Sequence, residues 1–246
     1  MSPTGAPTLS TMGETMFHTP ARNQDDLVRF YLDKNTDSAS LFHVWEDGGS
    51  RGDSVTPSTY SLEYRTWMAD RLAAELDRDG GELLSLGCGN AAVEAELVDR
   101  GYRVLAIDAM PEAVELARRK GVQAECADIY QWEPGRHWTV AYIDGVLGHL
   151  NDPAAGLVPV LSRIRAWLKP GADGLACLVA SNDAPNDGSP VQQAPGVDGF
   201  HWLSADYIAD QAVAAGFDKA EPGEFRYHRP ISGERVRSIV TAHLTR

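Results

Sequence analysis

The sequence predicts an α/β fold: a doubly wound sheet of seven strands, mostly parallel, with an antiparallel strand pair at its C-terminal end and an N-terminal helical lid. Apolar runs with strand character alternate with helical segments from about residue 83 to residue 215. Such alternation forms parallel sheets with right-handed crossovers that are covered on both faces. The last two strand-like runs are joined only by Pro-Ile-Ser-Gly at 230–233, and a connection this short favours an antiparallel pair.

Five short buried strands are expected in the alternating region, at 83–87, 102–108, 122–128, 138–144 and 174–181. Helices are expected at 90–100, 111–120, 153–168 and 204–215. Proline in the first turn and glycine just past the last turn mark several of these helix ends. Two further strands, at about 220–228 and 235–244, complete the sheet.

The first part of the chain differs in character from the expected sheet domain. Residues 1–20 are rich in Ser, Thr, Pro and Gly and are expected to be loose. A helix and turn are expected within 24–46, a polar, glycine-rich loop at 45–58, and a helix with an aromatic stripe over 58–76. The chain is therefore divided into a flexible N-terminus and lid, 1–54, and a main domain, 55–246.

Composition limits the classes of partner. The 246 residues include 43% hydrophobic residues and carry a net charge of −13, which repels phosphate backbones and anionic lipid. Neither nucleic acid nor a membrane is an expected partner. Three widely spaced cysteines, with no basic and apolar leader and no apolar run of membrane-spanning length, favour a cytoplasmic location.

A glycine corner follows the first expected strand, in the sequence Leu-Gly-Cys-Gly at 86–89. Without a Cβ, Gly87 can take a tight strand-to-helix turn, and Gly89 lets a ligand lie against the backbone. The corner falls at the carboxyl edge of the sheet, where doubly wound folds bind ligands. Asp108 ends the second strand, where a carboxylate can accept hydrogen bonds from both ribose hydroxyls. The pattern predicts a nucleoside ligand.

Two nucleoside cofactors fit this corner. Gly87, Gly89 and Ala92 satisfy the permissive dinucleotide pattern, so a nicotinamide-dependent oxidoreductase is one alternative. Further motifs follow the later strands: Asp128-Ile129 after the third, Asp144-Gly145 at the end of the fourth, and Lys169-Pro170-Gly171 before the fifth. In this order, and with a closing antiparallel pair, they resemble the class I S-adenosylmethionine-dependent methyltransferases over about residues 83–244.

The resemblance implies a Rossmann-like methyltransferase domain over 55–246 that binds S-adenosyl-L-methionine and releases S-adenosyl-L-homocysteine. The methionine end would lie at the glycine corner, the ribose at Asp108 and the adenine edge at Asp128. The cofactor-binding residues that it implies are Gly87, Cys88, Gly89, Asp108, Ala109, Met110, Asp128, Ile129, Asp144 and Gly145. The family often has a third glycine where this chain has Ala91. The alternative for Asp108 and Asp128 is that they only cap the helices that follow.

His149 is the expected catalytic residue, because it follows the fourth strand near the expected methyl position. Its unperturbed pKa of about 6.5 suits proton removal near neutral pH; the alternative is that it packs under the next helix. Acceptor contacts are expected from the N-terminal part and from the linker at 181–202. These substrate-binding residues are Tyr31, Tyr60, Tyr64, Asn182, Asp183, His201 and Trp202. No metal site is expected.

The expected acceptor is a small molecule, methylated on nitrogen, oxygen or an activated aromatic carbon in specialised metabolism. The N-terminal stretch and the long linker at 181–202 exceed a minimal fold of this type, and together they could cover the site. A non-catalytic S-adenosylmethionine-binding protein is a further alternative, and the oligomeric state is open.

Overall fold

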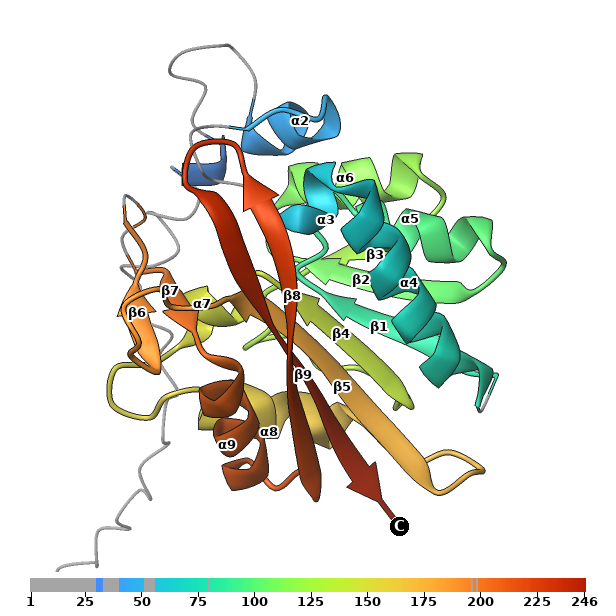
Figure 1. The fold of residues 1–246 in the computed structure, drawn as a ribbon. Helices are drawn as coiled ribbons and strands as arrows, with labels where there is room; N and C mark the ends of the chain where they lie inside the picture. The colour runs from blue at the N-terminus through green and yellow to red at the C-terminus, as the bar shows by residue number, and fades with distance from the viewer. Residues whose placement is uncertain (1–29, 33–39, 51–55, 79, 196, 198) are drawn as a thin grey trace, which may run out of the picture.

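A single sheet of seven strands organises the protein, in the order β3-β2-β1-β4-β5-β9-β8 (Figure 1). The structure is a computed structural model that describes residues 30–32, 40–50, 56–78, 80–195, 197 and 199–246. The strands are β1 Glu82–Leu86, β2 Arg103–Asp108, β3 Gln123–Cys126, β4 Val140–Asp144, β5 Leu175–Asp183, β8 Lys219–Arg229 and β9 Gly233–Thr245. The strand order reverses between β1 and β4, so the sheet has its topological switch point there.

The pairing confirms the predicted mixed sheet. The pairs among β1, β2, β3, β4 and β5 are parallel. β9 lies antiparallel to both β5 and β8. All five residues of β1 are buried, as expected for a strand covered on both faces.

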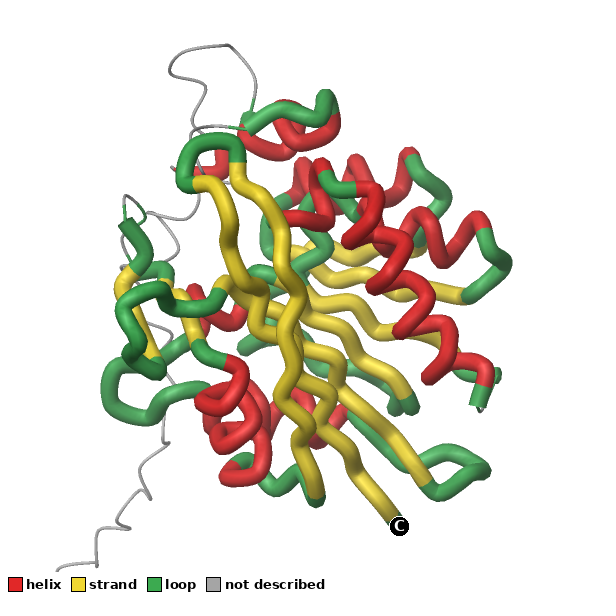
Figure 2. Tube along the Cα trace, viewed as in Figure 1, coloured by secondary structure: helices red, strands yellow, loops and turns green. Residues whose placement is uncertain are grey.

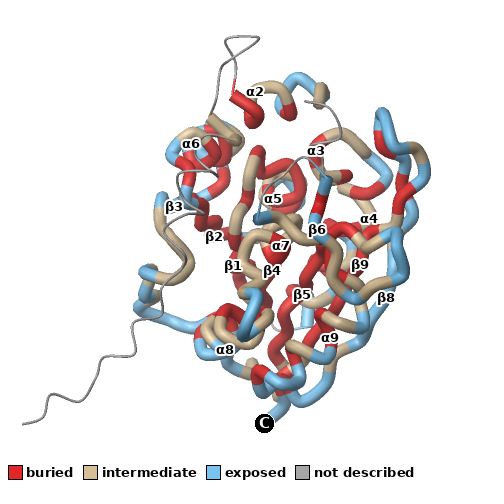
Figure 3. The backbone as a smooth tube through the Cα atoms, turned by 90° about the vertical axis from the view of Figure 1, so that its left-hand side faces the viewer, coloured by how far each residue is buried: buried red, intermediate tan, exposed pale blue. Residues whose placement is uncertain are grey.

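Helices cover both faces of the sheet (Figures 1 and 2). On one face, α4 Leu62–Asp77, α5 Ala92–Asp99 and α6 Pro111–Arg119 pack against Leu83 and Tyr142. On the other face, α8 Val158–Trp167 and α9 Ala205–Ala214 pack against Leu84 and Ile143. The central strands β1, β4 and β5 are therefore the most buried part of the sheet (Figure 3).

The N-terminal elements form a small layer over one edge of the domain. α2 Leu41–Glu46 packs its Phe42 and Trp45 against Met110 at the start of α6. α3 Pro57–Tyr60 ends at Ser61, and the Ser61 hydroxyl accepts a hydrogen bond from the Tyr64 backbone N–H at 3.2 Å to begin α4. The helix expected over 58–76 is therefore two helices. Most of the segment expected to be helical at 24–46 lies outside the described residues.

Two other predicted boundaries were wrong. The helix expected at 153–168 begins at Val158, because Asp152 accepts hydrogen bonds from the backbone N–H groups of Ala154 and Ala155, both at 2.8 Å, and forms a turn instead. A short helix, α7 Leu147–Leu150, precedes that turn. The linker at 181–202 continues β5 and then forms a separate antiparallel pair, β6 Val191–Gln193 and β7 His201–Leu203. Among the described residues, no helix combines the length and apolarity needed to cross a membrane.

Candidate cofactor and acceptor site

A cavity of about 560 Å³ lies where β1, β2, β3 and β4 end. Its volume is within the usual range for ligand pockets, and its place is the one expected for a doubly wound sheet. All ten residues that the sequence predicts for cofactor binding line this one cavity: Gly87, Cys88, Gly89, Asp108, Ala109, Met110, Asp128, Ile129, Asp144 and Gly145. The sequence motifs thus meet in space, although they come from four different strand ends.

The glycine corner has the backbone conformation that its residues predict. Gly87 has φ of +73°, and a Cβ there would lie 2.3 Å from a methyl group of Val146. Gly89 is also left-handed, with φ of +54°. Ala91, which replaces the family's third glycine, adopts the left-handed conformation too, with φ of 52°. The loop geometry is therefore kept at Ala91 despite the Cβ, at a modest cost in backbone strain.

Asp108 is fixed by two backbone donors and remains able to accept more hydrogen bonds. Its two oxygens accept from the N–H groups of Gly89 at 3.0 Å and Met110 at 2.8 Å. Burial raises the pKa of Asp108 to about 6, although both of these hydrogen bonds lower it. Each carboxylate oxygen has a second lone pair, so the group can still accept from two neighbouring hydroxyls. This donor and acceptor chemistry fits a ribose diol.

Asp128 lies at the other end of the cavity and also turns the chain. One of its oxygens accepts from the Tyr130 backbone N–H at 2.8 Å. Both Asp128 and Ile129 line the cavity. A carboxylate beside an apolar side chain can accept from an amino group while the apolar group covers a ring, and this chemistry fits an adenine.

Asp144 is engaged by groups of the protein itself. Its Oδ1 pairs with Arg237 of β9, and its Oδ2 accepts from the hydroxyls of Tyr142 at 3.0 Å and Tyr64 at 3.4 Å. Arg237 is fully buried and also donates to the Ser181 hydroxyl at 2.8 Å. The carboxylate is thus held from three sides.

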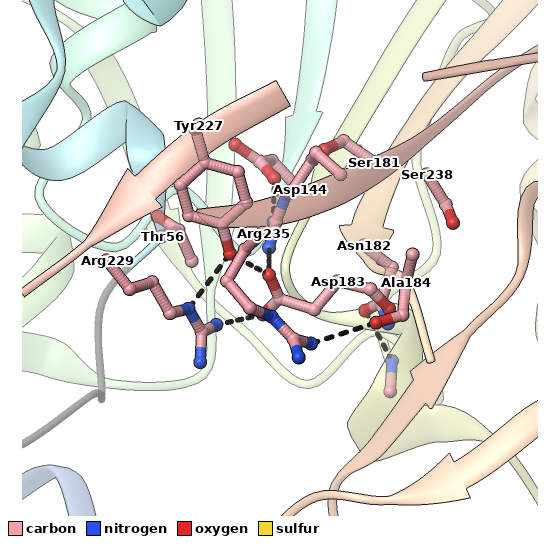
Figure 4. Close-up of polar contacts among 12 residues, drawn as sticks. Thr56, Asp144, Ser181, Asn182, Asp183, Ala184, Tyr227, Arg229, Arg235 and Ser238 are labelled. Carbon is pink, nitrogen blue, oxygen red and sulfur yellow. Dashed lines mark hydrogen bonds and ion pairs between the residues drawn. The ribbon is translucent and has the colours of Figure 1, made fainter. Parts of the chain in front are cut away.

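The same ionic network continues away from the cavity (Figure 4). Asp183 lies 3.1 Å from Arg237 and pairs with Arg229, and it also accepts from the Tyr227 hydroxyl. Burial alone would raise the pKa of Asp183, but the two arginines together lower it. The network therefore ties the β8–β9 pair to the ends of β4 and β5.

Aromatic side chains from the N-terminal part cover one end of the cavity. The ring of Tyr31 stacks on Phe42, with centroids 5.3 Å apart, and meets Trp45 edge-on at 5.9 Å. The Tyr31 hydroxyl lies 2.9 Å from Nε2 of His149. On its other side, His149 packs against Phe200 at 4.5 Å between ring centroids. All of these except Phe200 line the cavity.

The expected titration of His149 near neutral pH was wrong. Burial and, to a smaller extent, the charge of the neighbouring His201 lower the pKa of His149 to about 3. The imidazole is therefore neutral at physiological pH, and it is a weak base compared with a group whose pKa lies near 7.

Of the seven residues expected to contact the acceptor, Tyr31 alone lines the cavity in the described part of the chain. Tyr64 and Asp183 belong to the ionic network around Arg237 and do not line the cavity. The Tyr60 hydroxyl donates to the His228 carbonyl at 2.6 Å. Asn182 accepts from the Gly148 N–H and donates to the His201 carbonyl, both at 3.1 Å. Trp202 lies under the guanidinium of Arg235 at 4.0 Å.

Several side chains that line the cavity were missed in the sequence, among them Glu94 and Thr56. Glu94, in the first turn of α5, is 3% exposed and accepts from the Ser85 hydroxyl at 2.5 Å. An acid in a first helical turn is common as a complement to the helix dipole. The position of Glu94 in the sequence therefore did not indicate a ligand. Thr56 belongs to a segment that the sequence assigns to a loop.

Comparison with known proteins agrees with this site. The family model described as a methyltransferase domain matches residues 61–221, more than half of the chain. The chain therefore belongs to the methyltransferase family, and it is an S-adenosylmethionine-dependent enzyme of class I. This assignment removes the nicotinamide-dependent oxidoreductase as an alternative.

One relative is similar in sequence, and two solved structures are similar in fold. A tabtoxin biosynthesis enzyme of Pseudomonas amygdali pv. tabaci is 43% identical over 207 residues, which is 83% of this chain and 81% of the relative. A similar fold is found in the 1,6-didemethyltoxoflavin-N1-methyltransferase of Burkholderia thailandensis, which was solved with S-adenosylhomocysteine. The TM-score is 0.62 at 20% identity, and the match covers 96% of this chain and 93% of the methyltransferase chain. Magnesium protoporphyrin IX methyltransferase from Synechocystis PCC 6803 has a TM-score of 0.58 at 15% identity, with 89% and 97% coverage. At these identities the two structures show the shared fold alone.

Proposed function

We propose that this methyltransferase transfers a methyl group to a small-molecule acceptor in the biosynthesis of a specialised metabolite. The observation that carries the proposal is the aromatic wall of Tyr31, Phe42 and Trp45, which lines a cavity of about 560 Å³ beside His149. Further support comes from the relative that is 43% identical and is named for the biosynthesis of tabtoxin. A cavity of this volume favours a small acceptor over a polypeptide or a nucleic acid.

We further propose how the cofactor lies in the cavity. Asp108 holds the ribose hydroxyls, Ala109 and Met110 lie beside the adenine, and Asp128 with Ile129 holds its edge. The glycine corner, with Cys88, receives the methionine end, and Asp144 with Gly145 lies near the sulfonium. When bound, S-adenosylmethionine supplies a methyl group that is already activated, so the protein contributes alignment and the exclusion of water.

The proposed acceptor brings its own lone pair. Nε2 of His149 lies 2.9 Å from the Tyr31 hydroxyl, and the lowered pKa of the imidazole makes it a poor base for a phenol. Among the described residues that line the cavity, the charged side chains are carboxylates and none is Lys or Arg, which disfavours an anionic acceptor. A neutral amine or an aromatic ring nitrogen suits these walls best, so we place nitrogen ahead of oxygen and carbon.

The division into a lid, 1–54, and a methyltransferase domain, 55–246, is also proposed. In support, α2 and Tyr31 contribute walls to the cavity but no strand to the sheet. A cytoplasmic location is proposed from the chemistry of the cysteines: Cys88, Cys126 and Cys177 are all free, which suits a reducing compartment.

A methyl-transfer screen tests the acceptor class. Purified protein and S-adenosylmethionine would be incubated with sets of small amines, aromatic nitrogen heterocycles, phenols, indoles and carboxylic acids, and formation of S-adenosylhomocysteine would be measured against a reaction without acceptor. We expect turnover above this background in the nitrogen sets. Turnover confined to phenols or carboxylic acids would contradict the argument from His149 and the cavity walls.

A further inference from the structure

Glu94 is a buried acid in the wall of the cavity that the placement of the cofactor leaves without a role. It is 3% exposed, and the Ser85 hydroxyl of β1 donates to its Oε1 at 2.5 Å. A carboxylate so far removed from water is unfavourable unless hydrogen bonds or an opposite charge compensate for its lost hydration. The Ser85 hydroxyl and the backbone N–H of Glu94 itself compensate only in part, so a cationic group of a ligand would stabilise the ionised form.

The neighbouring acid, Asp144, is poorly placed to meet such a cation. Both of its oxygens already accept from protein groups, with Arg237 on one and the hydroxyls of Tyr142 and Tyr64 on the other. The positive charge of Arg237 also cancels much of its attraction for a second cation. Glu94 has no comparable arginine or lysine in contact among the described residues, so it is the acid with negative charge to offer at this end of the cavity.

We propose that Glu94 binds the α-ammonium group of the methionine portion of the cofactor, with Ser85 holding the carboxylate in position. The inference rests on the proposed placement of the cofactor, in which the methionine end lies at the glycine corner. It adds a cofactor-binding residue from the helix that follows the corner, and it assigns Asp144 a structural role through Arg237.

Binding of an ammonium group at Glu94 is expected to release a proton. Burial raises the pKa of Glu94 to about 7, although the hydrogen bond from Ser85 lowers it. A cation in contact favours the ionised form and lowers the pKa again. The other charged and titratable groups that act on Glu94 or respond to it are Asp144, Lys120, Cys88 and Tyr142. Burial keeps the pKa values of Cys88 and Tyr142 well above their usual range, so neither titrates near neutral pH.

Two ligands that differ in the amino-acid portion test the proposal by calorimetry. S-adenosylhomocysteine carries the ammonium group, and 5′-methylthioadenosine lacks it. At pH 8, Glu94→Gln is expected to weaken S-adenosylhomocysteine binding by about 10-fold to 150-fold, the range for loss of a hydrogen bond to a charged group. Binding of 5′-methylthioadenosine is expected to stay within about 3-fold of wild type. The matched control, Asp108→Asn, is expected to weaken both ligands. An equal effect of Glu94→Gln on the two ligands would overturn the proposal.

Proton release on ligand binding, measured with the wild-type protein, tests the role of Glu94 even if Glu94→Gln does not fold. At pH 6, binding enthalpies in buffers with different ionisation enthalpies give the number of protons released. Ionisation of Asp108 contributes equally with both ligands, so S-adenosylhomocysteine should release close to one proton more than 5′-methylthioadenosine. Equal release would overturn the role of Glu94. If the wild type binds neither ligand, the placement of the cofactor fails together with the role of Glu94, whereas binding of both with equal release rejects Glu94 alone.

Discussion

Replacement of Asp108 by Asn should weaken cofactor binding and stabilise the free protein at the same time. In the proposed site, the carboxylate accepts from two ribose hydroxyls with the lone pairs that Gly89 and Met110 leave free. An Asn side chain has one acceptor oxygen and therefore loses at least one charged hydrogen bond. That loss is worth about 1.5 to 3 kcal/mol, which corresponds to an affinity for S-adenosylhomocysteine about 10-fold to 150-fold lower.

The effect on stability follows from the raised pKa of Asp108. The pKa is about 6 in the folded protein against an ordinary value of 3.8. The contribution of Asp108 to the free energy of unfolding is therefore fully present below pH 3.8 and is lost as pH rises through about 6. Above that pH the ionised acid costs about 3 kcal/mol, at 1.36 kcal/mol for each pKa unit. Asn removes this cost but gives up one of the two backbone hydrogen bonds, worth about 1 kcal/mol. A net gain of about 2 kcal/mol is expected at pH 8, and no gain near pH 4, where the acid is protonated in the folded protein.

Calorimetric titration with S-adenosylhomocysteine and thermal unfolding without ligand at the two pH values measure both effects. Affinity within about 3-fold of wild type would refute the proposed role of Asp108 at the ribose. A lower Tm at pH 8 would contradict the argument from its raised pKa.

Three other changes have expected outcomes. His149→Gln should lower kcat/KM by less than about 10-fold and leave the pH–rate profile between pH 5 and 9 unchanged, because the imidazole is already neutral there; a loss of about 100-fold or more with a missing limb would make it a general base. Arg237→Met should lower the free energy of unfolding, measured in urea, by about 3 to 5 kcal/mol, since it leaves Asp144 and Asp183 without their shared partner; a change below about 1 kcal/mol would contradict this. Deletion of residues 1–54 should retain cofactor binding by calorimetry but abolish methyl transfer, and full turnover by the truncated protein would refute the lid.

That the ten residues proposed to bind the cofactor line one cavity was predictable, because the signals that place them are local in the sequence. Gly87 and Gly89 stand at a strand-to-helix turn, and the chemistry of that turn depends on a few neighbouring residues. Asp108 ends a strand, and parallel strands bring their carboxyl ends to one edge of the sheet. Once the order of strands and helices was recognised, these residues had to meet.

The acceptor side was less predictable because its side chains meet across long stretches of chain. The linker at 181–202 was expected to bring polar groups to the acceptor. It instead forms β6 and β7, and Asn182 satisfies backbone groups of Gly148 and His201. Polar residues in a long connection bond to the chain where they can, since an unsatisfied buried group is unfavourable, and the sequence alone does not tell which partner they find.

The sequence by itself determined the mixed seven-stranded sheet, the glycine corner and the line of carboxylates that follows the strand ends, because periodicity and turn chemistry act over a few residues. Only the tertiary structure decided the charge of the groups at the centre of the site. Arg237, 93 residues from Asp144 in the chain, occupies one oxygen of that acid, while burial holds His149 neutral and raises the pKa of Glu94. Burial and long-range pairing set these charges, and both exist only after the chain has folded.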